Sequence, residues 1–247
     1  MYQFLITNED LTLFLLIGIF FLFVFGLRIF LPKRIYFVRH GETILNAAHI
    51  RQDDRGGLTD DGREQAKATG IRLARMHIEH MYISPYERTI ETSGIINEFV
   101  RIPFTYTKLL TERKNPTEII GKKSDDLEVE KIVNQIDLAN HDKNFRYSNE
   151  ENFADLQKRA EKLLRYLAFR PYKTILCVTH GIFLKMVLAN IVYGKTLTPL
   201  IHATLTYLTT VNNAGITLVT YNPWNFFLGK KIWSIVIFDD ISKIKEI

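Results

Sequence analysis

Hydrophobic residues are spread unevenly along the chain, and the longest apolar run lies near the N-terminus. Residues 11–27 contain no charged side chain, and 17 of the 21 residues from 11 to 31 are Leu, Ile, Phe or Val. A helix of that length spans about 31 Å at ~1.5 Å per residue, which matches a bilayer hydrocarbon core of about 30 Å. The pattern therefore predicts one transmembrane helix over about residues 11–31, within an N-terminal anchor of residues 1–32.

Two other interpretations fit this run less well. A secretory signal needs a basic residue before its apolar core and small residues at its cleavage site. No Lys or Arg precedes Arg28, and residues 27–30 (LRIF) lack small side chains. A buried core helix is rarely apolar on every face in a chain of this size.

The charges that flank the run predict its orientation. Glu9 and Asp10 precede it, whereas Arg28, Lys33 and Arg34 follow it. By the positive-inside rule, we expect a single-pass protein of the cell membrane with its N-terminus outside and the rest of the chain in the cytoplasm. The single cysteine of the chain suits a reducing compartment.

Beyond residue 32, short apolar runs of strand length alternate with segments of helical periodicity. The pattern predicts strands at residues 35–38, 81–83, 174–178, 205–211, 215–221 and 233–238, and helices at about 59–76, 84–99, 152–167 and 181–193. Residues 212–215 (NNAG) predict a turn between the strands at 205–211 and 215–221. This alternation is typical of an α/β fold, here a three-layer α/β/α sandwich with a mainly parallel sheet.

Two segments have the S-x-x-E spacing of a capping box. Ser84 stands three residues before Glu87, with Pro85 at the expected first helical position, and Ser148 stands three residues before Glu151. A Ser hydroxyl and a Glu carboxylate at this spacing can satisfy the free N–H groups of a helix start. We therefore expect helices to begin at both segments.

Composition excludes several classes of protein. The chain has 247 residues, of which 47% are hydrophobic and 24% charged, so it is neither disordered nor collagen-like. One cysteine, Cys177, excludes a disulfide scaffold and a Cys-based zinc site. The formal net charge is +5, and five Lys or Arg against two Glu fall within residues 108–123. Because no aromatic residues are interleaved with these cations, the excess does not predict nucleic-acid binding.

Two histidines stand at the ends of predicted strands. His40 and His180 each follow an apolar strand directly and precede a glycine. Ligands of open α/β sheets bind beyond the carboxyl ends of the strands, so both imidazoles can share one pocket. Arg39 precedes His40, and Arg88 lies in the helix after the 81–83 strand. Since guanidinium groups bind phosphate oxygens bidentately, these four residues predict a site for a dianionic tetrahedral group.

Five short motifs follow one another within residues 34–240. They are Arg39-His40-Gly41-Glu42-Thr43 with Asn46, residues 58–66 (LTDDGREQA), residues 84–92 (SPYERTIET), residues 178–181 (VTHG) and residues 213–216 (NAGI). In this order they resemble the motifs of the histidine phosphatase superfamily. The resemblance implies a phosphoglycerate mutase-like fold over residues 33–247, with a variable lid at about 108–147.

The resemblance also implies roles for individual residues. His40 would be the nucleophile that forms a phosphohistidine, and Glu112 in the lid would be the general acid. Arg39, Arg88 and His180 would hold the phosphoryl oxygens. Thr43 and Asn46 would donate further hydrogen bonds to the phosphate. No cofactor or metal is expected, because two arginines supply the positive charge that a metal would otherwise supply.

Three functions remain open at this point. The first is a histidine acid-type phosphatase, a phosphomonoester hydrolase acting on a phosphorylated small molecule or a phosphoprotein. The second is a phosphoglycerate mutase, although residues 113–116 (RKNP) depart from the R-x-Y-G that follows the lid Glu in mutases. The third is a non-catalytic module that binds phosphate and recruits a partner to the membrane. The presence of all four pocket residues and the predicted anchor favour the phosphatase.

Overall fold

The computed structural model describes residues 15–17, 26 and 28–242. Most of the predicted span at residues 11–31 lies outside these described residues. Within them, no helix is both long enough and apolar enough to cross a membrane.

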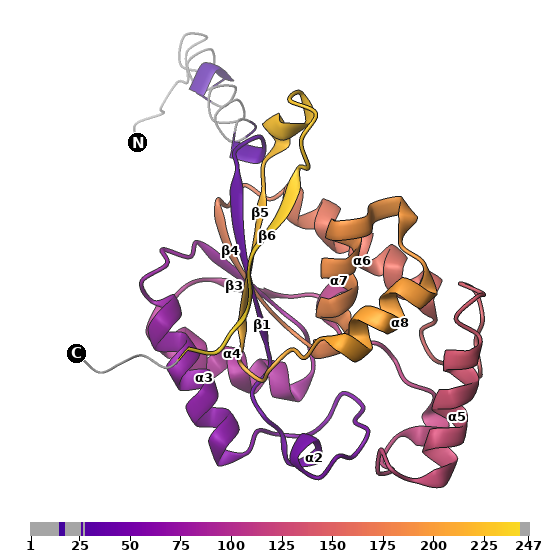
Figure 1. Cartoon of the computed structure of the whole chain (residues 1–247). Coiled ribbons are helices and arrows are strands. Elements are labelled where there is room, and N and C mark those ends of the chain that lie inside the picture. The colour runs from indigo at the N-terminus through magenta and orange to yellow at the C-terminus, as the bar shows by residue number, and fades with distance from the viewer. Residues whose placement is uncertain (1–14, 18–25, 27, 243–247) are drawn as a thin grey trace, which may run out of the picture.

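Six strands form one mixed sheet, in the order β3–β2–β4–β1–β5–β6 (Figure 1). The strands are β1 (Lys33–Arg39), β2 (His80–Ile83), β3 (Phe104–Tyr106), β4 (Thr174–Thr179), β5 (Ile216–Tyr221) and β6 (Trp233–Asp240). The four strands β1 to β4 are parallel to one another, whereas β5 pairs antiparallel with both β1 and β6. The predicted α/β fold with a mainly parallel sheet is confirmed.

Helices cover both faces of this sheet (Figure 1). One face carries α3 (Asp60–Leu73) and α4 (Glu87–Val100), and the other carries α6 (Phe153–Ala168), α7 (Gly181–Tyr193) and α8 (Pro199–Leu208). The short helix α2 (Ile44–Ala47) follows β1, and α5 (Leu127–Leu138) lies in the predicted lid. Single 3₁₀ turns occupy Lys108–Leu110, Thr117–Ile119, Gly194–Thr196 and Pro223–Phe226.

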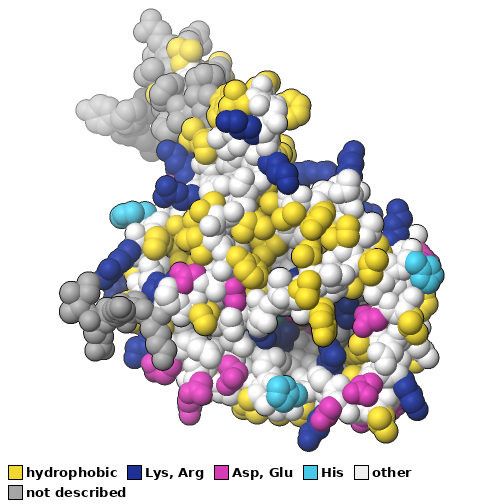
Figure 2. All heavy atoms as spheres, in the orientation of Figure 1, with side chains coloured by type: hydrophobic (Ala, Val, Ile, Leu, Met, Phe, Trp, Pro, Cys, Tyr) yellow, Lys and Arg dark blue, Asp and Glu magenta, His cyan; other side chains and the backbone are white. Residues whose placement is uncertain are grey.

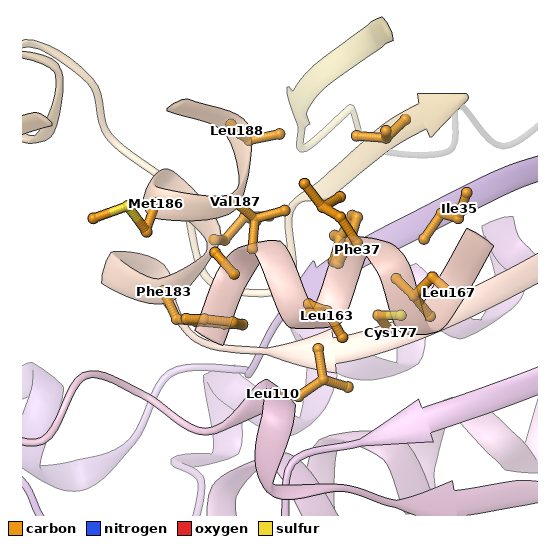
Figure 3. Close-up of a cluster of buried hydrophobic side chains, with 14 of the residues drawn as sticks. Ile35, Phe37, Leu110, Leu163, Leu167, Cys177, Phe183, Met186, Val187 and Leu188 are labelled. Carbon is orange, nitrogen blue, oxygen red and sulfur yellow. The ribbon is translucent and has the colours of Figure 1, made fainter. Parts of the chain in front are cut away.

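The two helical layers explain why the central strands are apolar without alternation. Successive side chains of β1 point to opposite faces, and both faces are covered. Ile35 and Phe37 pack with Leu163 of α6 and Val187 of α7 (Figure 3). Tyr36 and Val38 pack into the cluster beneath α3 and α4. The buried sheet therefore fixes the position of the residues at its strand ends.

The strand predicted at residues 205–211 is wrong, because most of this segment belongs to α8. The hydroxyl of Thr198 accepts a hydrogen bond from the Ile201 N–H (3.2 Å), and Pro199 occupies the first turn of the helix. Lys185 of α7 donates to the carbonyl of Thr206 (2.8 Å), which ties α8 to α7. Short apolar runs do not distinguish a strand from one buried side of a helix. The NNAG segment accordingly joins a helix to β5 rather than two strands.

Both predicted capping boxes are also wrong. Helix α4 begins at Glu87 after Tyr86, and no side chain caps it. Helix α6 begins after Asn152, whose side chain accepts a hydrogen bond from the Asp155 N–H (3.0 Å). The S-x-x-E spacing shows only that a capping box is possible. The serine hydroxyl forms its hydrogen bond with whichever partner the tertiary fold places within reach. For Ser84 that partner lies in the site described next.

Candidate active site

The sheet brings the two strand-end histidines together. Strands β1 and β4 are parallel neighbours, with Arg39 opposite Thr179, so His40 and His180 leave the sheet side by side. Their ring centroids are 5.3 Å apart at an interplanar angle of 58°. The His40 N–H donates to the Thr179 carbonyl (3.0 Å), which extends the pairing by one residue.

His40 is held in one tautomer. Its Nδ1 lies 2.8 Å from the carbonyl oxygen of Gly41. Because a carbonyl oxygen can only accept, Nδ1 carries the proton and Nε2 has the free lone pair. The imidazole is buried, and burial followed by the nearby Arg88 and Arg39 guanidinium groups holds its pKa well below the usual range. The ring is therefore neutral at pH 7, with a nucleophilic Nε2.

His180 has the opposite tautomer. Arg88 Nε donates to His180 Nδ1 (3.2 Å), so this nitrogen carries no proton. The proton is then on Nε2, which donates to the hydroxyl of Ser84 (2.7 Å). Burial, and after it Arg88, hold the pKa of His180 well below its usual range. Ser84 is thus a site residue that the sequence analysis missed, because its motif was interpreted as a helix cap.

Both predicted arginines lie near His40 and line the same cavity. Arg88 is only 3% exposed, and its NH1 donates to the carbonyl of Asp53 (2.8 Å). Arg39 NH1 donates to the carbonyl of Val211 (2.5 Å), while its buried Nε has no partner among the described residues. Arg39 is anchored through one nitrogen and Arg88 through two, so each guanidinium keeps at least one nitrogen available for a ligand.

Arg39, His40 and Arg88 line an open cavity of about 640 Å³. Its lining includes Asn46 and carries the cationic side chains Arg39, Arg51, Arg88, Arg113 and Lys185 and the carboxylates Glu42 and Glu112. Arg51 Nε and Arg113 Nε are buried and make no hydrogen bond within the described part of the chain. The cavity is therefore strongly positive and suited to anions.

Glu112 reaches this cavity from the lid. Its carboxylate accepts hydrogen bonds from the N–H groups of Ile182 (3.1 Å) and Phe183 (2.8 Å), in the first turn of α7. It also accepts one from the Arg113 N–H (2.8 Å). Among the described residues this carboxylate makes no ion pair with the side chains of Arg113 or Lys114, and its partners are backbone N–H groups. Instead the lid carboxylate sits at the N-terminal end of the helix that His180 precedes.

Thr43 and Asn46 are placed differently from each other. Thr43 is fully buried and does not line the cavity. Its hydroxyl accepts from the Asn46 N–H (3.1 Å) and donates to Gln52 Oε1 (3.1 Å), so it caps α2 and positions a cavity-lining side chain. Asn46 does line the cavity. Direct contact of both residues with a phosphate remains a prediction.

The backbone at His40 and Gly41 is held by two further hydrogen bonds. Asn213 Nδ2 donates to the His40 carbonyl (3.0 Å). Gly41 donates its N–H to Thr92 Oγ1 (3.0 Å), and a Cβ at Gly41 would lie 2.5 Å from the Gly62 carbonyl oxygen. Only glycine fits there, which explains the glycine after the strand-end histidine.

A neutral imidazole with a free Nε2 lies near two guanidinium groups in a positive cavity, an arrangement suited to binding a phosphoryl group. A sequence model of the histidine phosphatase superfamily (branch 1) matches residues 35–230. The chain belongs to this superfamily.

Individual relatives include mutases and phosphatases. "Probable phosphoglycerate mutase GpmB" of Erwinia tasmaniensis is 29% identical over 160 residues, which cover 64% of this chain and 74% of the relative. The human 6-phosphofructo-2-kinase/fructose-2,6-bisphosphatase 4 is 28% identical over 165 residues, but the match covers only 32% of that protein. Among solved structures, the α-ribazole phosphatase of Shigella flexneri has the same fold, with a TM-score of 0.69, 20% identity, and coverage of 87% of this chain and all of the other.

Proposed function

We propose that the protein is a metal-independent phosphomonoester hydrolase that acts through a phosphohistidine on His40. The observation that carries this proposal is the free Nε2 of the neutral His40 beside Arg39 and Arg88. Nε2 attacks phosphorus, and the bond from phosphorus to the ester oxygen breaks. The two guanidinium groups stabilise the phosphoryl oxygens, with His180 packed against both His40 and Arg88. Water then attacks the phosphohistidine and releases inorganic phosphate.

Glu112 is proposed to exchange protons with the leaving group and with water. It lines the same cavity as His40, on a lid segment held against α7. Protonating the ester oxygen matters most when the leaving alcohol is a poor leaving group. Glu112→Gln should therefore slow turnover of alkyl phosphates at least ~10-fold more than turnover of aryl phosphates. Equal slowing of both would contradict a role as general acid.

The decisive test is phosphate release by the full chain in EDTA, from a panel of phosphomonoesters. We expect release that survives the chelator, and an acid-labile phosphoenzyme trapped with labelled substrate. His40→Ala should abolish both. His141→Ala, which removes an exposed lid histidine that does not line the cavity, is the matched control. Release that persists in His40→Ala would exclude the phosphohistidine mechanism.

A phosphoglycerate mutase is the second candidate, favoured by the identity to GpmB. A mutase transfers the phosphoryl group from the histidine back to the substrate, whereas a phosphatase transfers it to water. The segment after Glu112 (residues 113–116, RKNP) lacks the mutase pattern and supports the phosphatase. Isomerisation of 3-phosphoglycerate without net phosphate release would identify a mutase. Absence of both reactions would leave a non-catalytic phosphate-binding module.

The substrate is proposed to carry a second negative charge. Arg51 and Arg113 line the cavity, and the buried Nε atom of each has no partner among the described residues. An unpaired guanidinium at a cavity wall is best satisfied by a ligand anion. Arg51→Gln should raise KM at least ~10-fold for a phosphomonoester with an additional carboxylate or phosphate, and leave KM for a singly substituted aryl phosphate unchanged.

We further propose a membrane tether, with the chain crossing the membrane once and the catalytic domain in the cytoplasm. The support is the uncharged run at residues 11–27 and the cations that follow it. The full chain should stay with membranes after carbonate extraction. Protease added to the cytoplasmic side should degrade the domain, and recovery of the chain in the carbonate supernatant would contradict the tether.

A further inference from the structure

The connection between β5 and β6 ends in an unusually apolar loop. We call residues 222–232 the aromatic tip. Trp224, Phe226, Phe227 and Leu228 are 53%, 74%, 77% and 64% exposed. Lys230 and Lys231 follow them, and no acidic residue occurs from position 222 to 238. Figure 2 shows hydrophobic side chains gathered at this end of the molecule, with Lys and Arg side chains beside them.

The register of the sheet places the aromatic tip at one pole of the domain. Lys33, the first residue of β1, pairs with Tyr221, and Tyr221 pairs with Trp233. The tip therefore projects beyond the amino end of β1, where residues 28–31 enter the domain (Figure 1). Phe30, at this same entry, is 55% exposed. His40 follows the opposite, carboxyl end of β1.

We propose that the aromatic tip, beside residues 28–31, is a second membrane contact seated in the surface of an anionic bilayer. Trp is enriched at the membrane interface, where its ring is amphipathic, and Lys is attracted to anionic head groups. A cluster of exposed aromatic side chains is uncommon on a free surface of a protein in water. The aromatic tip also lies beside residues 28–31, where the chain enters the domain. Because the proposed tether precedes these residues, it would bring the tip to the bilayer.

The proposed tether and the aromatic tip lie at the same pole of the domain. Together they determine how the active site is oriented relative to the bilayer. The seven residues of β1 place His40 about 23 Å from the tip end of the strand at ~3.3 Å per residue. The head-group layer is only about 5–8 Å thick. Resting on the proposed phosphatase function, we infer that the substrate is a water-soluble phosphomonoester or a phosphate on an extended segment, and not a lipid head group.

Tryptophan fluorescence tests the contact on the full chain, which contains only Trp224 and Trp233. In Trp233→Phe, Trp224 is the single reporter. In vesicles of phosphatidylcholine and phosphatidylglycerol, we expect a blue-shifted emission that falls at least twofold when the acyl chains carry bromine near the head groups. Trp224→Phe is the matched control, because the remaining Trp233 is partly buried against Tyr221 and should be quenched much less.

Each outcome decides the proposal independently of catalysis. If the chain binds vesicles but Trp224 is not quenched, the proposed membrane contact of the aromatic tip is wrong, while the proposed tether is unaffected. A chain that does not bind vesicles overturns both. A blue shift that appears in lipid-free detergent and grows with protein concentration would show that a second copy covers the tip, which also overturns the proposal. Phosphate release measured on the same samples reports separately on the proposed function.

Discussion

At the scale of single residues, the site depends on two histidines held in opposite tautomers. Gly41 offers only a carbonyl oxygen to His40, whereas Arg88 offers only an N–H to His180. The Gly41 carbonyl can only accept a hydrogen bond and the Arg88 N–H can only donate one, so each ring is restricted to a single tautomer. The consequence is a nucleophilic Nε2 on His40 and a donor Nε2–H on His180, two chemically different imidazoles whose rings are neighbours.

Ser84 should act as a positioning residue for His180. Its hydroxyl receives the only N–H of that ring, at 2.7 Å. Ser84→Ala leaves this buried donor unsatisfied, and we expect kcat to fall about 10- to 100-fold with little change in KM. Ser93→Ala is the matched control, since Ser93 is a buried serine in α4 whose hydroxyl donates to the Ile90 carbonyl (2.9 Å). Steady-state kinetics of both variants, with rescue by Ser84→Thr, would separate positioning from a general loss of stability.

His202 makes the stability of the fold sensitive to acid. Burial, and after it Arg113 and Lys185, lower the pKa of His202 to about 4. The unfolded chain binds a proton near pH 6.5, so stability is present above that pH and is lost as the pH falls toward 4. Between pH 7 and pH 5 the full chain should lose about 2 kcal/mol of unfolding free energy that His202→Gln does not lose. Urea unfolding at both pH values measures this difference, and parallel losses in the two proteins would contradict it.

At the scale of elements, the lid is positioned by one arginine of α6. Arg159 forms an ion pair with Glu151 (2.6 Å) and donates to the carbonyls of Leu109, Thr111 and Glu112 (3.3, 2.7 and 3.3 Å). Its guanidinium also stacks over the ring of Phe183, 4.0 Å from the centroid. The segment that carries Glu112 is thus held against α6 by Arg159 and against α7 by the hydrogen bonds of the Glu112 carboxylate.

Removing Arg159 should release this segment. Arg159→Met keeps an unbranched side chain on Phe183 but leaves the partly buried Glu151 unpaired. We expect a loss of about 2 kcal/mol of unfolding free energy and a kcat at least ~10-fold lower, because Glu112 loses its position. Arg165→Met, at an exposed site of the same helix, is the control. Lower stability with an unchanged kcat would mean that Arg159 supports the fold alone.

Some elements can be predicted from the local sequence, and others cannot. The helix start at Thr59 and the strands around Phe37 and Cys177 are predicted correctly, because local capping and continuous burial determine them. The segment at 205–211 and the partner of Ser84 depend on contacts with α7 and with His180, which no local pattern contains. The motifs therefore predict which residues meet at the strand ends, while their tautomers and the lid contacts require the tertiary structure.

At the scale of the whole molecule, the sheet separates two surfaces of different chemistry. The carboxyl ends of β1 and β4 hold the cationic cavity, and the amino end of β1 lies beside the aromatic tip. In an open α/β sheet the ligand site lies beyond the carboxyl ends of the parallel strands. With the proposed tether before β1, the active site therefore faces away from the membrane.

This geometry predicts how far a membrane-bound substrate must extend. We consider an aryl phosphate attached to a lipid through a Gly/Ser spacer, in vesicles that contain the full chain. A 20-residue spacer has a root-mean-square length of about 25 Å and reaches the cavity, whereas a 2-residue spacer extends about 8 Å and does not. Turnover should be at least ~10-fold slower with the short spacer. The same two compounds without the lipid should be hydrolysed equally fast, and equal rates on vesicles would mean that the active site faces the bilayer.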